Sequence, residues 1–218
     1  MPLFSKSITI NSFFSGPIKV SFFFGAPRME IGGLLQSGSI IRQIWQKAVW
    51  QFQQGQSLLA RTDPAGVLIL GLGAGTSAEL FAKTWPQAEI IGVEIDPQII
   101  KIGRKYFKLK ELETKKRLKI IPADAFKTIE KLLKEKQKFD LIAVDLYQGN
   151  KMVQKAWEDP FLINLKDITA KNGAIVFNHI FWDEHKKEAE LFIKKAEKYF
   201  TKVKLSRVLA NLLVITKN

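Results

Sequence analysis

The first feature of this sequence that could do chemistry is a run of alternating glycines, Gly71-Leu72-Gly73-Ala74-Gly75, directly after the apolar run Val67–Leu70. Glycine permits a sharp turn and leaves nothing beyond Cα in the way of a ligand. A helix that begins after such a turn presents free N–H groups and a partial positive charge. The run therefore predicts a ligand-binding turn; the alternative is a glycine-rich turn that binds nothing.

The spacing of these glycines distinguishes between cofactors. The dinucleotide fingerprint G-x-G-x-x-G would place its third glycine at the position of Thr76, whereas the third glycine of this chain is Gly75. The pattern G-x-G-x-G after a first strand is typical of proteins that bind S-adenosylmethionine. We therefore expect Gly71, Gly73 and Gly75 to bind this cofactor, with the helix terminus facing a methionine carboxylate rather than a pyrophosphate.

Glu94 closes the next apolar segment, 23 positions after Gly71. This offset is close to the roughly 20 residues expected for an acid that binds the ribose of a nucleotide. A carboxylate can accept hydrogen bonds from both ribose hydroxyls; the alternative is an exposed acid at a strand end. Asp96 is different, because it precedes Pro97 at a predicted helix start, and we assign it to capping.

Two further acids end strands. Asp124 follows the third predicted strand, where it could accept from an adenine amino group while the backbone N–H of Ala125 donates to a ring nitrogen; the alternative is a helix N-cap. Asp145 ends the fourth strand. Doubly wound sheets bind ligands at the carboxyl ends of their strands, so Asp145 should face the reacting end of the cofactor, as a base or beside the sulfonium; the alternative is an acid that only orders a loop.

The elements that must position these residues alternate between short apolar runs and longer amphipathic ones. Strands are expected at Val67–Leu70, Glu89–Glu94, Leu118–Pro122, Phe139–Asp145, Ala174–Asn178, Lys202–Arg207 and Asn211–Thr216, with a turn at Asn172-Gly173. Helices are expected at Thr76–Thr84, Pro97 to about Leu109, Phe126–Lys136, Asp159 to about Ala170 and Asp183–Tyr199. Such alternation predicts an α/β fold with a mostly parallel sheet, and the last two strands are too close in sequence to pair other than antiparallel.

The first 60 residues have a different character. Ser7–Ile10, Ile18–Phe24 and Met29–Ile31 are predicted short strands, and Ser39–Gln53 is a predicted amphipathic helix. Three short strands are too few for an independent domain. We therefore expect residues 1–60 to form an N-terminal β appendage with a lead-in helix, and residues 61–218 to form the cofactor-binding domain.

Composition limits the class of protein. The 218 residues include no cysteine, which excludes disulfides, thiolate metal sites and cysteine nucleophiles. No run reaches the roughly 18 apolar residues of a membrane span, and we expect a cytoplasmic protein without a membrane partner or a metal. The net charge of +13 indicates either a lysine-rich solvated surface or an anionic partner such as a nucleic acid.

Several segments together resemble the spermidine synthase family. They are Gly33–Ser37, Gly92–Pro97, Arg104–Phe107, Asp124–Phe126 and Phe139–Asp145. The resemblance covers roughly residues 15 to 180. It implies a Rossmann-like class I methyltransferase fold, a seven-stranded sheet with one reversed C-terminal strand, together with a small N-terminal β region. It also implies that Gln36 contacts the cofactor and that the protein could be a homodimer.

The sequence departs from that family at two places. Aminopropyltransferases carry an aspartate in the glycine turn, which holds the amine of decarboxylated S-adenosylmethionine, where this chain has Ala74. They also carry a second acid after the fourth strand, in a run that grips the polyamine, where this chain has Leu146–Gly149. A polycation needs several carboxylates in its groove. These departures favour a methyltransferase over an aminopropyltransferase.

We therefore predict a spermidine synthase-like methyltransferase that uses S-adenosylmethionine and acts on an unidentified acceptor, most simply a small molecule. A polyamine aminopropyltransferase that uses decarboxylated S-adenosylmethionine is the alternative, and a non-catalytic nucleotide- or RNA-binding module is the third reading. The predicted substrate wall consists of Gln36, Asp145, Tyr147, His179 and Trp182, and Asp145, Tyr147 and His179 are the candidate catalytic residues. For His179, a general base and a polar residue satisfied at a strand end are both open.

Overall fold

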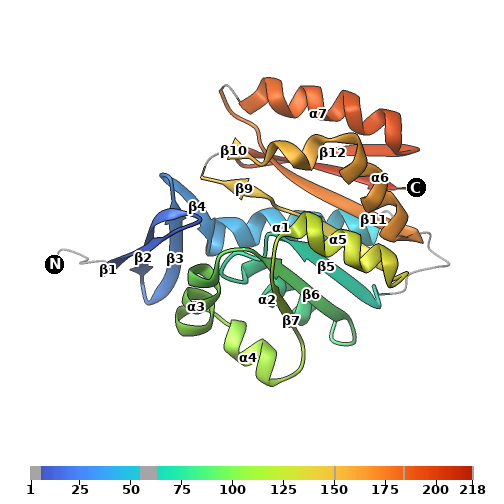
Figure 1. The fold of residues 1–218 in the computed structure, drawn as a ribbon. Coiled ribbons are helices and arrows are strands. Elements are labelled where there is room, and N and C mark those ends of the chain that lie inside the picture. The colour runs from blue at the N-terminus through green and yellow to red at the C-terminus, as the bar shows by residue number, and fades with distance from the viewer. Residues whose placement is uncertain (1–5, 55–62, 150, 184, 218) are drawn as a thin grey trace.

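The computed structural model describes residues 6–54, 63–149, 151–183 and 185–217, which form two sheets flanked by helices and a small two-stranded hairpin (Figure 1). The larger sheet has seven strands in the order β12-β13-β11-β8-β5-β6-β7. Its strands are β5 (Gly66–Leu70), β6 (Glu89–Glu94), β7 (Lys119–Pro122), β8 (Phe139–Val144), β11 (Thr169–Ile180), β12 (Lys202–Val208) and β13 (Asn211–Lys217). Only β13 runs antiparallel to both of its neighbours, which confirms the predicted sheet with its reversed C-terminal strand.

Helices cover both faces of this sheet because the buried strands alternate their side chains between two apolar clusters. Val67 and Ile69 face the cluster that includes α1 (Ser39–Gln54), α2 (Thr76–Thr84) and α4 (Leu109–Thr114). Leu68 and Leu70 face the cluster that includes α5 (Ala125–Lys134), α6 (Asp159–Ile168) and α7 (His185–Tyr199). The result is a three-layer arrangement, helices on sheet on helices, as the alternating pattern predicts.

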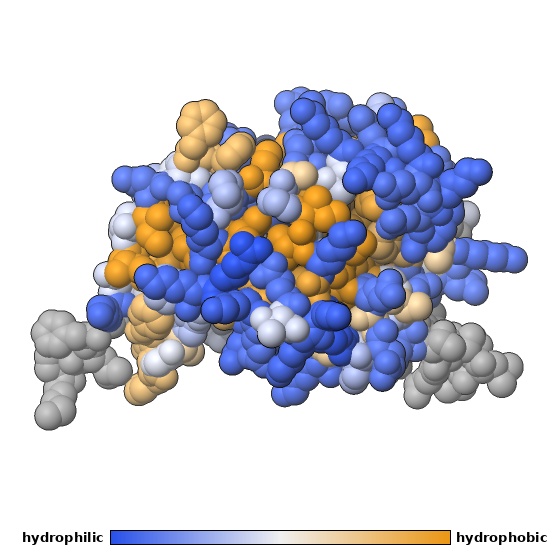
Figure 2. All heavy atoms as spheres, turned by 60° about the horizontal axis from the view of Figure 1, so that its bottom comes forward, coloured by the Kyte–Doolittle hydropathy of each residue, from blue (hydrophilic) through white to orange (hydrophobic). Residues whose placement is uncertain are grey.

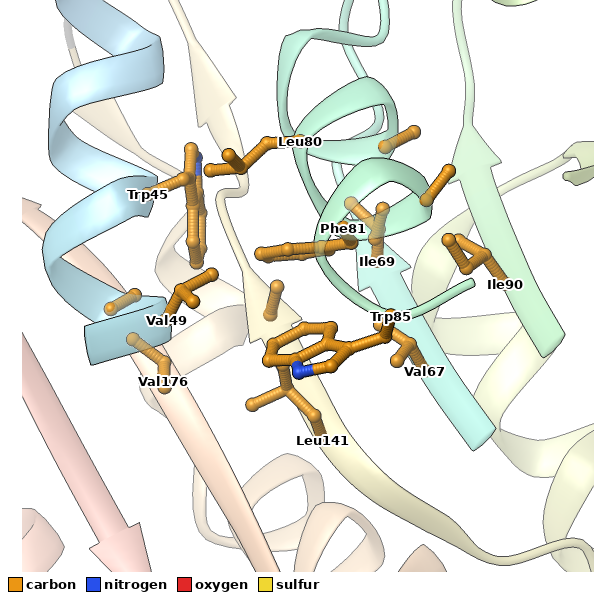
Figure 3. Packing of buried hydrophobic residues seen from close by; sticks show 14 of the residues in the cluster. Trp45, Val49, Val67, Ile69, Leu80, Phe81, Trp85, Ile90, Leu141 and Val176 are labelled. Carbon is orange, nitrogen blue, oxygen red and sulfur yellow. The ribbon is translucent and has the colours of Figure 1, made fainter. Parts of the chain in front are cut away.

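Aromatic side chains fill the layer between α1, α2 and the sheet (Figure 3). Trp45 of α1 meets Phe81 of α2 edge to face, with 5.8 Å between ring centroids, and Phe81 lies 5.4 Å from Trp85. All three rings are buried, and truncation of one such residue to alanine typically costs about 3–5 kcal/mol. This packing holds α1 firmly against the strand ends where the acids of the predicted site lie.

The N-terminal sheet has the order β1-β2-β3-β4 and consists of β1 (Ser7–Ser12), β2 (Gly16–Phe23), β3 (Ala26–Ile31) and β4 (Leu34–Ser37). Its buried face packs on the main domain through an apolar cluster that joins Ile18 and Met29 to Ala74 and to Ile99 of α3 (Pro97–Tyr106). β4 carries Gln36 and is absent from the sequence-based assignment. The domain boundary expected at residues 60 and 61 lies outside the described residues.

Two sequence-based assignments are wrong in detail. The helix expected from Pro97 to about Leu109 ends at Tyr106, and α4 follows because Leu109 turns inward and packs against Gly75 and Gly103. The turn expected at Asn172-Gly173 lies inside β11, where the register with β8 shifts between Thr169 and Ala174. The short hairpin of β9 (Tyr147–Gln148) and β10 (Lys151–Met152) and the 3-10 turn η1 (Gln154–Trp157) are also unpredicted.

The surface is largely hydrophilic, as Figure 2 shows for one face, where a smaller apolar area is exposed between hydrophilic side chains. Some lysines form short ion pairs, such as Lys115, directly after α4, with Glu111 on α4. No helix within the described residues is both long enough and apolar enough to span a bilayer.

Candidate functional site

A cavity of about 290 Å³ lies at the carboxyl ends of β5, β6, β7 and β8. In a doubly wound sheet, ligands bind at the carboxyl ends of the strands, at the point where the strand order reverses, which here is the position of β5 between β8 and β6. The N-terminal sheet and α1 close its other side through Gln36, Ser37 and Trp45. Its size is at the lower end of the range for small-molecule sites.

The glycine turn forms one wall. Gly71 has a φ of +87°, and a Cβ at this residue would lie 2.1 Å from the carbonyl oxygen of Asp145, so only glycine fits. Gly73 has a φ of +58° and donates its N–H to Glu94 Oε2 at 2.8 Å. Gly71 and Gly73 both line the cavity. Gly75, which we expected to bind the cofactor, instead packs behind the wall, where a Cβ would collide with Leu109 at 2.2 Å.

Glu94 lies at the end of β6 and lines the same cavity. Besides the bond from Gly73, its Oε1 accepts a hydrogen bond from the N–H of Asp96 at 3.0 Å. Burial raises the pKa of Glu94, and the backbone hydrogen bonds from Asp96 and Gly73 oppose that rise. Each carboxylate oxygen has a further acceptor position, so the residue can hold the glycine turn and still accept a hydroxyl donor from a ligand.

Asp124 and Ala125 line the cavity at the end of β7. Asp124 also caps α5, since its Oδ1 accepts from the backbone N–H of Lys127 at 3.0 Å. The capping alternative from the sequence is therefore present in the structure, together with the position at the cavity. Asp96, assigned to capping, has that role: its Oδ1 accepts from Gln98 N–H at 2.8 Å.

Asp145 follows β8 and lies in the cavity wall. Its Oδ1 accepts a hydrogen bond from the side-chain amide of Asn178 at 2.9 Å, and Asn178 is itself oriented by an amide hydrogen bond from Asn211 at 2.9 Å. Burial raises the pKa of Asp145 to about 6, while Asn178 and the nearby indole of Trp45 oppose the rise. The indole N–H makes no hydrogen bond of normal geometry with the described residues. Asp145 can thus exchange a proton near neutral pH.

Tyr147 and Gln36 both line the cavity, but the Tyr147 hydroxyl and the Gln36 amide nitrogen already form hydrogen bonds within the protein. The Tyr147 hydroxyl donates to the carbonyl oxygen of Asn178 at 3.1 Å and accepts from the N–H of Ile180 at 2.8 Å. Burial raises the pKa of Tyr147 well above its usual value. Gln36 donates to the carbonyl oxygen of Gly149 at 3.2 Å. Tyr147 is therefore a structural anchor of the hairpin, and Gln36 ties the N-terminal sheet to that hairpin.

His179 and Trp182 are not brought to the cavity. His179 lies on the opposite face of β11, with its ring 4.3 Å from Phe192 of α7 and 6.2 Å from Trp157, centroid to centroid. Its Nε2 is buried without a hydrogen-bond partner in the described part of the chain, and burial lowers the pKa of His179 to about 3. A general base at this residue does not fit that environment. Trp182 is 46% exposed and packs beside His185.

Other residues of the cavity were missed by sequence reasoning. Trp45 belongs to the apolar period of a helix, which gives no signal of a site. Asn178, predicted only as the end of a strand, does not line the cavity but donates to the Asp145 carboxylate that does. Phe14 and Ser15, in the turn between β1 and β2, also line the cavity. Thr76 and Ser77, at the N-terminus of α2, line the cavity as well. The glycine motif did predict a helix terminus at this place.

Ala74, the position of the missing aspartate, is fully buried and belongs to the apolar cluster that contains Met29, Ile31 and Ile99. Those three residues also line the cavity. At Ala74, where the family resemblance would place a carboxylate, the chain therefore has an apolar side chain.

The fold and the cavity together define a class: a Rossmann-like domain with the seven-stranded sheet of class I methyltransferases and a cavity at its carboxyl edge. The chain belongs to the spermine/spermidine synthase family, whose domain model matches residues 54–211. It is therefore a spermidine synthase-like member of the class I methyltransferase superfamily.

Both aminopropyltransferases and methyltransferase homologs match the chain. A polyamine aminopropyltransferase of Vibrio vulnificus is 28% identical over 121 residues, which is 56% of this chain and 40% of that protein. The eEF1A lysine and N-terminal methyltransferase homolog of Drosophila melanogaster is 28% identical over 124 residues, 54% of this chain and 18% of that protein. Aminopropyltransferases are the more numerous of these relatives, and the chain spans about half of their length or less.

Solved structures agree on the fold. Spermidine synthase from Thermotoga maritima has a TM-score of 0.75 at 16% identity and covers 96% of this chain and 71% of its own. Human methyltransferase-like protein 13, in complex with SAH, has a TM-score of 0.62 at 18% identity and covers 82% of this chain and 79% of its own.

Proposed function

We propose that this protein transfers an alkyl group from an S-adenosyl sulfonium cofactor to a nucleophile held beside Asp145. One observation carries the proposal: a single cavity collects Gly71 and Gly73, Glu94, Asp124 and Asp145 from the ends of four adjacent parallel strands. When bound, the cofactor supplies an electrophilic carbon attached to a sulfonium.

The chain offers a partner for each part of that cofactor. Glu94 is the acceptor for ribose hydroxyls, and Asp124 with the N–H of Ala125 is assigned to adenine. Thr76 and Ser77 lie at the N-terminus of α2, where N–H groups and the helix dipole favour a carboxylate. The backbone of the glycine turn can approach the cofactor closely, because Gly71 and Gly73 line the cavity without side chains.

Asp145 is the residue to which we assign proton transfer. Its pKa of about 6 leaves a carboxylate at neutral pH that can accept the proton of an acceptor N–H or O–H group. The remaining contribution is positioning, since an acceptor that is held in line with the sulfonium gains most of its rate from proximity. His179 and Tyr147 are left out of the catalytic set.

The choice between the two groups transferred depends on which observation is weighed. The comparisons favour aminopropyl transfer, because polyamine aminopropyltransferases predominate among the relatives. The glycine turn favours methyl transfer, because Ala74 provides no carboxylate for the amine of a decarboxylated cofactor. We propose methyl transfer from the chemistry of the glycine turn and keep aminopropyl transfer as the second candidate.

The acceptor that fits this cavity is a small molecule with few positive charges. Asp145 is the acid that follows β8, and the hairpin after it presents Leu146, Tyr147 and Gln148 to the cavity. Binding of nucleic acid to the basic surface, a homodimer, and the division into residues 1–60 and 61–218 remain predictions from the sequence.

Calorimetric titration with S-adenosylmethionine and with its decarboxylated form tests the donor. We expect tighter binding of S-adenosylmethionine, a rise in melting temperature on its addition, and S-adenosylhomocysteine as product. Preference for the decarboxylated form, with methylthioadenosine released in the presence of putrescine, would establish the second candidate. Binding of neither donor, with salt-sensitive RNA binding, would overturn the enzyme proposal.

A further inference from the structure

The turn between β1 and β2, residues 13–15, is fixed to the cofactor side of the cavity by an unusual pair of contacts. The hydroxyls of Ser12 and Ser15 both donate to the same oxygen, Asp96 Oδ2, at 2.6 Å each. Ser12 Oγ also accepts from the backbone N–H of Phe14 at 3.1 Å. We call Ser12, Ser15 and Asp96 the serine latch.

The latch connects directly to the proposed ribose acid. Asp96 is fully buried, and its backbone N–H donates to Glu94 Oε1, whose other oxygen holds Gly73. The turn of the N-terminal sheet is therefore linked through two residues to the carboxylate that we assign to ribose. Because charge-assisted hydrogen bonds are short and strong, the latch fixes where the turn lies relative to that carboxylate.

The latch leaves the two aromatic residues of the turn in different environments. Phe14 lines the cavity and is 42% exposed, whereas its neighbour Phe13 is 96% exposed, does not line the cavity and meets the Phe14 ring edge to face. Ile95, between Glu94 and Asp96 in sequence, also lines the cavity and is 44% exposed. Two large apolar side chains are thus left partly open at the mouth, where an adenosyl group would cover them.

We infer that Phe14 is a cofactor-binding residue, held by the serine latch over the adenosyl part of the cavity. The inference rests on the proposed function, because it requires an adenosyl ligand in this cavity. It makes the N-terminal sheet a part of the binding site rather than an appendage, since the ring that covers the ligand comes from the β1–β2 turn.

Phe13 provides the matched control, because it is the same residue type one position away. Kd would be measured by calorimetry for S-adenosylhomocysteine and for methylthioadenosine, which share the adenosyl part and its sulfur and differ in the other group on that sulfur. Stacking of an aromatic ring on a base is worth about 1–3 kcal/mol, so Phe14→Ala should weaken both ligands by a similar factor of about ten or more. Phe13→Ala should change neither Kd by more than about twofold, and Phe14→Tyr should restore binding.

The latch is tested by the double variant S12A/S15A, with S7A/S21A as control. Ser7 and Ser21 are paired across the same two strands, at the other end of the hairpin. S12A/S15A should weaken both ligands severalfold, and this loss should disappear when Phe14 is already alanine, because the latch acts through that ring. Circular dichroism and the melting temperature of each variant establish that it is folded, and Phe14→Leu serves as a second variant if Phe14→Ala is not.

The results separate the two proposals. Wild-type protein that binds neither ligand contradicts the proposed function itself. Wild-type binding that is unchanged by Phe14→Ala, or reduced equally by Phe13→Ala, overturns the role of Phe14 while leaving the proposed function in place. A latch variant that weakens binding equally with and without the Phe14 ring overturns the latch as the device that positions it.

Discussion

Asn178 and His179 are neighbours on β11, yet they lie in two opposite environments. Asn178 donates to Asp145 at the cavity and is held by Asn211. His179 is buried among the rings of Phe192 and Trp157 on the other face of the sheet. The pairing teaches that a place at the carboxyl edge of a sheet is not enough for a role in chemistry, because the face on which a side chain lies decides what it can reach.

Burial on the two faces moves the two pKa values in opposite directions. Burial raises the pKa of Asp145 to about 6 and lowers the pKa of His179 to about 3. Both shifts favour the uncharged form, but only Asp145 has neighbours that stabilise its charge. Asp145 therefore changes protonation in the range where an enzyme works, and His179 stays neutral throughout it.

The largest effect is expected from Asp145→Asn, which removes the proposed base and keeps the shape of the side chain. The transfer rate at pH 8 should fall about 100-fold or more, while Kd for S-adenosylhomocysteine stays within a few fold. Single-turnover assays and calorimetry measure the two quantities. Asp167→Asn, at an exposed acid of α6, is the control; a rate for Asp145→Asn near that of wild type would remove Asp145 from the mechanism.

A smaller effect is expected from Asn178→Leu, which replaces the amide by an apolar group of similar shape. Since the Asn178 hydrogen bond lowers the pKa of Asp145, its loss should raise that pKa and move the rate profile to higher pH. Wild type should gain activity as pH rises through about 6, and the variant only at higher pH, with about tenfold less activity at pH 7. An unshifted profile would contradict the coupling; Asn172→Ala, in the exposed part of β11, is the control.

The pH dependence of folding gives a third, still smaller effect. The pKa of Asp145 is higher in the folded protein than in the unfolded chain, so the unfolded chain ionises first as pH rises. The stabilisation that the folded protein gains from protonated Asp145 is fully present below pH 4 and is lost as pH rises through about 6. Asp145→Asn should therefore gain stability relative to wild type by about 2 kcal/mol between pH 4 and pH 7. Urea unfolding at both pH values measures this, and a constant difference would show that the pKa is unshifted.

The smallest effect on activity is expected from His179→Leu on the opposite face. The transfer rate should stay within about twofold of wild type, because the ring lies away from the cavity. Its folded pKa is below that of the unfolded chain, so wild type loses stability as pH falls below about 6.5, and the variant should not. Thermal unfolding from pH 7 to pH 5 tests this, and a large loss of turnover would return His179 to the list of catalytic candidates.

Much of the fold follows from local pattern. The buried strands, the Asp96-Pro97 helix start and the antiparallel final pair all come from periodicity and capping chemistry. The break between α3 and α4 does not follow from local pattern. It depends on how Leu109 fits against Gly75 and Gly103, which lie in other elements of the structure. Only contacts between elements determine such a break.

The candidate site was predictable to a similar degree. Glycine spacing and strand-end acids indicated Gly71, Gly73, Glu94, Asp124 and Asp145, which line one cavity. His179 was misplaced because the predicted strand stopped at Asn178; the alternation continued one residue further would have put His179 on the face of Phe177. Trp45 and Phe14 come from elements whose docking onto the sheet no local pattern reveals.

The close approach of Gly71 to the Asp145 carbonyl fixes the separation between the glycine turn and the backbone of Asp145 by main chain alone. Side chains that follow Asp145 can change without altering that spacing, because none of them contributes to it. Changes in the hairpin can therefore alter which acceptor binds, while the spacing between the glycine turn and Asp145 stays the same.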